Sequence, residues 1–81
     1  MTLNQIAIFN HESNETFANM ILTEKAENLH TVFMLATRGI RFGKYSRMSI
    51  LSKFRHDRKK LRNIVLGNDK QYPIVEISQR P

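Results

Sequence analysis

Apolar residues recur at alternating spacings of three and four over the first half of this 81-residue chain. Such spacing places side chains on one face of an α-helix, because a helix makes one turn every 3.6 residues. The pattern predicts an amphipathic helix over residues 15–37, either continuous or broken in two at Thr23-Glu24-Lys25, with one face buried. Its apolar members are Phe17, Ala18, Ile21, Leu22, Ala26, Leu29, Phe33, Ala36 and Ile40.

A second apolar series predicts a second long helix. Ser46 is a suitable N-cap for it, and Gly67-Asn68-Asp69 is a suitable C-terminal stop. Arg58 falls on the apolar face, so either its guanidinium reaches the surface along its aliphatic stem or the apolar stripe is narrow at this position. The apolar members of the series are Ile50, Leu51, Phe54, Leu61 and Val65.

Short segments at the two ends of the chain are typical of β-strands. Residues 3–9 and residues 72–78 are rich in β-formers, and Pro73 restricts the second segment to an edge or a strand start. The two strands would pair with each other or with those of a second subunit. Polar residues 10–14 predict a turn, with Asn10, Ser13 or Asn14 as the cap of the first helix.

The fold class expected from these elements is α+β, mainly α, as one small domain spanning residues 1–81. Its order is a short N-terminal strand, two long helices joined by a glycine-containing turn, and a short C-terminal strand (β-α-α-β). Gly39 and Gly43 bracket the turn, where each can adopt a positive φ.

Positive charge is concentrated in the middle of the chain. Residues 38–62 hold ten Lys and Arg residues against one acid, Asp57, whereas residues 1–37 hold Lys25 against four glutamates. The first stretch therefore carries +9 and the second −3. A positive field of this density attracts polyanions, and nucleic acid is the commonest of them.

The residues required by common catalytic sites are missing from the sequence. There is no cysteine, and the three histidines are too far apart in sequence to suggest a metal site. Three glycines cannot supply a P-loop or a dinucleotide fingerprint. We therefore expect a non-enzyme with no catalytic residues, cofactor or metal. The lack of cysteine and of a signal-peptide pattern leads us to expect a cytoplasmic protein.

Two helices joined by a short glycine-containing turn have the outline of a helix-turn-helix, whose second helix reads DNA from its N-terminal residues. Here Arg47 would contact guanine, while hydroxyls would donate to phosphates or base edges and later cations would follow the phosphate backbone. The residues predicted to bind nucleic acid are Arg41, Lys44, Tyr45, Arg47, Ser49, Lys53, Arg55, Lys59 and Lys60.

The turn and second helix resemble small, mostly uncharacterised phage-encoded helix-turn-helix proteins. The match spans about residues 16–59 and rests on Gly39-Ile40-Arg41-Phe42-Gly43-Lys44-Tyr45-Ser46, followed by Ile50, Phe54-Arg55 and His56-Asp57. The family's downstream Phe-Lys-hydrophobic-Asn-Asn segment is missing from this chain. The resemblance implies a phage origin, a bacterial host cell and DNA binding.

The expected function is that of a small DNA-binding regulator from a phage or mobile element, with double-stranded DNA as its partner and homodimerisation to enlarge a small core. A second hypothesis is an inhibitor that binds a host protein or defence complex, because such a protein would have the same composition. RNA binding is the third, because a basic helix serves it equally well. No membrane association is expected, since no apolar run is long enough to span a bilayer.

Overall fold

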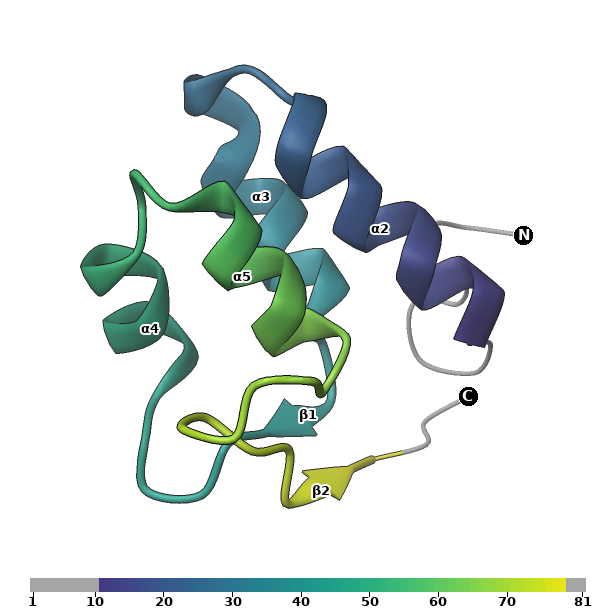
Figure 1. Cartoon of the computed structure of the whole chain (residues 1–81), viewed down its shortest axis with the longest axis vertical. Coiled ribbons are helices and arrows are strands. Elements are labelled where there is room, and N and C mark those ends of the chain that lie inside the picture. The colour runs from purple at the N-terminus through teal and green to yellow at the C-terminus, as the bar shows by residue number, and fades with distance from the viewer. Residues whose placement is uncertain (1–10, 79–81) are drawn as a thin grey trace.

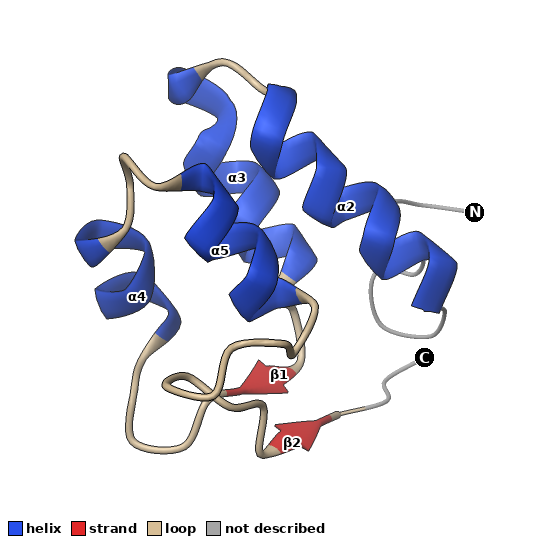
Figure 2. Ribbon diagram, in the orientation of Figure 1, coloured by secondary structure: helices blue, strands red, loops and turns tan. Residues whose placement is uncertain are grey.

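The computed structural model describes residues 11–78 as four helices and one two-stranded antiparallel sheet. The elements follow in the order α2 (His11–Thr23), α3 (Ala26–Ala36), β1 (Ile40–Arg41), α4 (Arg47–Lys53), α5 (Arg58–Val65) and β2 (Glu76–Ile77). α2, α5 and α4 lie across the front of the molecule, with α3 behind them (Figure 1). The sheet closes one end of this helical body (Figure 2).

The first predicted helix is two helices, α2 and α3, which pack against each other as a hairpin. The chain turns at Glu24 and Lys25, and the Asn28 side chain donates to Glu24 Oε1 at 3.0 Å beside the turn. This break shifts the apolar face: Leu22 and Ala26 are exposed, whereas Leu29 and Phe33 are buried. A continuous helix is therefore wrong, and the break at the polar run is confirmed.

The second predicted long helix is also two helices, α4 and α5, separated by Phe54 to Asp57. Ser46 caps α4 as predicted, because its Oγ accepts from the Ser49 amide at 3.1 Å. α5 begins at a second cap, where Asp57 Oδ1 accepts from the Lys60 amide at 3.1 Å. The continuous helix is wrong here because Asp57 binds this amide and begins a new helix.

α5 ends where the sequence predicts, at Gly67. The Gly67 amide donates to Ile64 O and the Asn68 amide donates to Asn63 O, at 3.1 Å and 2.9 Å. This pair of bonds is the Schellman motif, which requires a left-handed residue at Gly67, whose φ is 76°. A loop over residues 68–75 then leads to β2.

The sheet differs from the predicted pairing. β2 pairs with β1, inside the predicted turn, in the register Ile40 with Ile77 and Arg41 with Glu76. The predicted strand at residues 3–9 lies outside the described residues, so the β-α-α-β order is not confirmed. Gly39 has a φ of 78°, and a Cβ there would lie 2.9 Å from Ser78 O, so only glycine allows the chain to pass this close.

The turn predicted at residues 10–14 is also corrected. α2 already begins at His11, so Ser13 and Asn14 lie inside the helix and do not cap it. Asn10 lies outside the described residues.

The core forms between the α2–α3 hairpin and the later helices. Residues from α2, α3, β1, α4, α5 and the last loop contribute to one cluster of buried side chains. Its largest fully buried members are Phe17, Phe33, Phe42, Ile21, Leu29, Ile50, Leu51, Leu61, Ile64 and Val65. The predicted apolar faces thus form the core, apart from the exposed Leu22 and Ala26 and the partly buried Phe54. Phe42 fixes the turn between the helices on the core.

Candidate nucleic-acid interface

In the second half of the chain the shorter connection between helices joins α4 to α5, not α3 to α4. We call these two helices the α4–α5 unit. Only four residues, Phe54 to Asp57, connect α4 to α5. The connection from α3 to α4 runs over residues 37–46 and contains β1. A connection of three or four residues is the length that a helix-turn-helix uses. The second helix of the unit is therefore α5, which the sequence did not separate from α4.

Arg58 fixes the position of α5 on α2. Its guanidinium Nη1 donates to Ile21 O and Glu24 O, each at 2.9 Å. These carbonyls lie at the C-terminal end of α2, which has no basic residue in its own last turn. Carbonyls at a helix end lack partners within the helix, and a cation there is favoured by the helix dipole. The prediction that Arg58 reaches out to solvent is wrong; its charge is used inside the fold.

Arg47, the predicted base-reading residue, is held by α3. It is half-buried, and its Nη1 donates to Met34 O at 3.1 Å. The Ser49 hydroxyl donates to Ser46 O at 2.8 Å, so it completes the N-cap of α4. Each of these side chains therefore has a hydrogen bond within the fold, which restricts the directions in which it can meet a ligand.

Three aromatic rings and two lysines join the end of α4, α5 and the loop over residues 68–75. The ring centroids of Tyr45 and Phe54 lie 4.7 Å and 5.4 Å from that of Tyr72. Lys53 Nζ donates to the Tyr72 hydroxyl at 3.2 Å, and Lys60 Nζ lies 5.3 Å from the Phe54 ring centroid. Tyr72 is only 4% exposed. These rings pack against one another and under ammonium groups, so they do not offer an open stacking platform for bases.

Lys60 also forms an ion pair within the fold. Its Nζ lies 2.8 Å from Asp69 Oδ2, and the other Asp69 oxygen accepts from the amides of Gln71 and Tyr72. The hydrogen bond from Lys60 lowers the pKa of the Asp69 carboxyl below its ordinary value, and burial opposes that effect. Lys60 is thus neutralised by a partner on its own chain.

The remaining predicted residues are exposed. Arg41 forms a solvent-exposed pair with Glu76 across the sheet, with Nη2 and Oε2 3.6 Å apart. Lys44 lies in the turn before α4, 5.4 Å from the Tyr45 ring centroid. Arg55 and Lys59 are exposed in the α4–α5 connection and in α5, and among residues 14–78 neither side chain has a hydrogen bond or ion pair.

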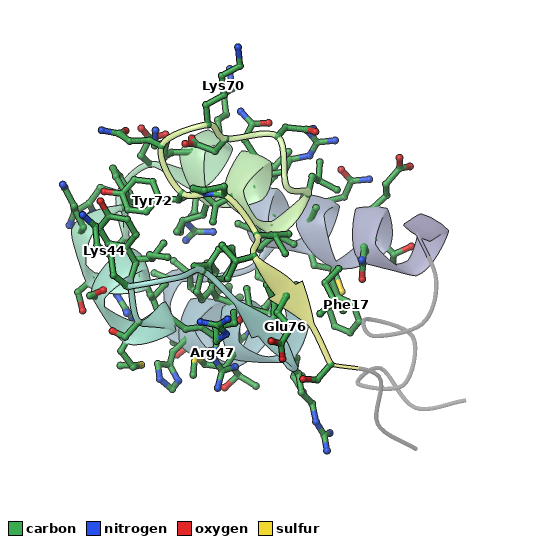
Figure 3. All side chains as sticks on the ribbon, turned by 90° about the horizontal axis from the view of Figure 1, so that it is seen from below. Phe17, Lys44, Arg47, Lys70, Tyr72 and Glu76 are labelled. Atoms are coloured by element: carbon green, nitrogen blue, oxygen red, sulfur yellow. The ribbon has the colours of Figure 1, made fainter. Side chains whose placement is uncertain are left out.

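The sequence reasoning missed two further exposed residues. Asn63 lies one turn after Lys59 on α5, and Lys70 lies in the following loop. Lys70 projects on the side of the molecule where α5 lies, whereas Arg47 lies on the opposite side, near α3 (Figure 3). We call the exposed residues Lys44, Lys53, Arg55, Lys59 and Lys70 the basic face; among residues 14–78, whose side chains the structure describes, none of them has an acidic partner within 4.0 Å.

Other kinds of site receive no support from the described part of the chain. Residues 14–78 bring together no group of three or more His, Asp or Glu side chains that could hold a metal ion. In the same range no helix is long and apolar enough to cross a membrane.

Comparisons with known proteins give no match. No protein-family model, no curated protein and no solved structure is significantly similar to this chain. The functional argument therefore depends on the chemistry of the basic face and on the geometry of α4 and α5.

Proposed function

We propose that this chain is a small DNA-binding regulatory protein that binds double-stranded DNA through the α4–α5 unit. The observation that carries the proposal is the separation of α4 and α5 by only four residues, next to a basic face whose cations have no acidic partner among residues 14–78. In this arrangement α5 would enter the major groove, which is wide enough to admit an α-helix.

The contacts of the cations support α5 over α4 as the helix that meets DNA. Both cations of α4 bind within the fold, Arg47 to α3 and Lys53 to Tyr72. On α5, Arg58 and Arg62 bind α2 and Lys60 binds Asp69, which leaves Lys59. Lys59 and Arg55 have no such bonds, so they can contact phosphates without loss of an internal interaction. The first helix of the unit, α4, then serves to position α5, as the first helix of a helix-turn-helix does.

We propose duplex DNA and not duplex RNA as the ligand, because the major grooves of the two duplexes differ in shape. The major groove of an A-form RNA duplex is too deep and narrow for side chains to read, whereas that of B-DNA admits a helix. The buried position of Tyr72 disfavours single strands, whose recognition depends on open aromatic stacking.

Salt titration of duplex binding tests the proposal. If the five cations of the basic face each neutralise one phosphate, log K should fall against log[salt] with a slope of about −4 to −5, from about 0.9 per phosphate. Fluorescence anisotropy with a labelled DNA duplex measures this slope. No binding to duplex DNA at the lowest salt concentration would rule the proposal out.

A pair of double variants locates the contact. Arg55→Ala with Lys59→Ala should make the slope shallower by about 2. Arg38→Ala with Arg41→Ala removes the same charge from exposed residues outside the α4–α5 unit and should leave the slope nearly unchanged. Equal effects of the two double variants would mean that DNA does not contact α5 preferentially.

A protein target remains the alternative, and one further experiment decides between the two. The tagged chain is used to capture partners from a bacterial lysate with and without nuclease. Loss of all partners after nuclease treatment supports nucleic-acid binding, whereas a partner that survives the treatment, together with no DNA binding in the titration, supports the inhibitor hypothesis.

A further inference from the structure

The outward side of α5 carries one polar side chain that the fold does not use. Asn63 is exposed, and within the described residues its side-chain amide has no hydrogen-bond partner. Only its backbone carbonyl has a structural role, as the acceptor of the Asn68 amide at 2.9 Å. Asparagine is a weak helix former, so an unpartnered one within a short helix gives little local stability.

Lys59 shares this outward side. Residues four apart on a helix lie one above the other, and Leu61, Ile64 and Val65 form the opposite, buried side of α5. The Arg62 side chain points toward α2, because its Nε donates to Asn19 Oδ1 at 3.1 Å. Lys59 and Asn63 are therefore the two side chains that α5 presents outward with their polar groups unengaged.

We infer that Lys59 and Asn63 form a base-reading pair on α5, specific for a guanine and an adenine close together in the DNA major groove. This inference rests on the proposed DNA binding. A side-chain amide matches adenine, because it accepts from N6 and donates to N7 at the same time. A lysine ammonium donates to O6 and N7 of guanine.

The spacing of the two residues limits the spacing of the two bases. Four residues of helix rise about 6 Å, at 1.5 Å per residue. Successive base pairs are about 3.4 Å apart along one strand. The adenine and the guanine are therefore expected within about two base steps of each other.

Selection of binding duplexes from a randomised DNA pool tests the inference with the full chain. The unaltered chain should enrich an adenine and a guanine at this spacing. Asn63→Ala should abolish the preference for adenine and keep the preference for guanine. Lys59→Ala should abolish the preference for guanine and keep the preference for adenine. Asn68→Ala, the same substitution in the loop after α5, should leave both preferences in place. Circular dichroism of each variant confirms that it is folded.

A modified base separates direct reading from an indirect effect. Replacing the selected adenine by 7-deazaadenine removes the N7 acceptor without changing base pairing. The unaltered chain should bind this duplex about tenfold or more weakly than the unmodified duplex. Asn63→Ala should bind the two duplexes with equal affinity.

The outcomes distinguish the inference from the function on which it rests. If the chain binds duplex DNA but Asn63→Ala keeps the preference for adenine, or loses as much affinity with 7-deazaadenine as the unaltered chain, the base-reading pair is wrong and DNA binding stands. If the unaltered chain binds no duplex at low salt, both the inference and the proposed function are wrong.

Discussion

The two helix pairs formed by the described residues are built alike but differ in the charged side chains that they expose. α2 and α3 are joined at Glu24-Lys25, and α4 and α5 are joined by four residues that end at Asp57. The first pair contributes the largest buried rings of the core and exposes acids such as Glu27. The second pair exposes cations, of which only some bind within the fold. From this difference we assign a scaffold role mainly to the first pair and propose the second pair as the one that binds a partner.

Truncation of one phenylalanine in each pair should show this difference most strongly. Phe33→Ala should destabilise the fold by about 3–5 kcal/mol, because the ring is fully buried in α3. Phe54→Ala should cost roughly half as much, since its ring is only partly buried at the margin of the core. Urea unfolding of both variants measures the costs. Equal losses would mean that the second pair is as much a part of the core as the first.

Two adjacent cations of α5 should respond in opposite ways. Arg58→Met should destabilise the fold by about 2–3 kcal/mol, because two carbonyls at the end of α2 lose a charged donor. Lys59→Met should change the free energy of unfolding by about 0.5 kcal/mol or less, since this side chain is exposed and unpaired. Thermal unfolding of the two variants checks the contrast. Similar melting temperatures would contradict the assignment of Arg58 to the scaffold.

These two pairs also show what the sequence predicts and what it does not. Ser46 and Gly67 act on neighbouring amides and carbonyls, so their roles as cap and stop follow from local sequence. The role of Arg58 depends on carbonyls in another helix, which no local pattern reveals. The break before α5 carries one local signal, Asp57, but the flanking apolar spacing continues across it and predicts a single helix.

The residues of the candidate site also differ in how far the local sequence predicts them. Exposure of Lys59 and Arg55 follows from their position opposite the apolar series, so the sequence predicts it. The capture of Arg47 by Met34 O depends on how α3 and α4 pack, which the sequence does not specify. The pairing of β2 with β1 likewise joins distant segments that each contain only a weak strand pattern.

The ion pair of Lys60 and Asp69 should make a pH-dependent contribution to the free energy of unfolding that is smaller than the contribution of Arg58. Asp69→Asn should cost about 1 kcal/mol at neutral pH, because the charged hydrogen bond is lost. The pKa of Asp69 is lowered in the folded state, so its contribution is present above the unfolded pKa of about 4 and is lost as the pH falls through the lower folded value.

Denaturant unfolding at neutral and acidic pH measures this contribution. The difference in stability between the unaltered chain and Asp69→Asn should shrink on acidification. Lys60→Met should show the same weakened pH dependence, because it removes the other partner. A difference that stays constant between the two pH values would contradict the role given to this pair.

The exposed pair on the sheet should have the smallest effect. Arg41→Ala should cost about 0.5 kcal/mol or less, because Arg41 and Glu76 are both largely exposed and solvent screens their attraction. The same variant should leave the salt dependence of DNA binding unchanged, whereas Lys59→Ala should reduce it. Thermal unfolding and the anisotropy titration check the two statements. A large loss of DNA affinity in Arg41→Ala would mean that DNA contacts the sheet and not α5.

The bond from Arg58 to α2 also bears on the order in which the chain folds. Arg58 lies 37 and 34 positions after the two residues whose carbonyls it binds. During synthesis α2 and α3 leave the ribosome first, so the end of α2 initially has only water for these carbonyls. The hairpin is completed when α5 arrives and docks. Docking of α5 and completion of the C-terminal end of α2 are therefore expected as a single late event, and a chain that stops before Arg58 lacks both.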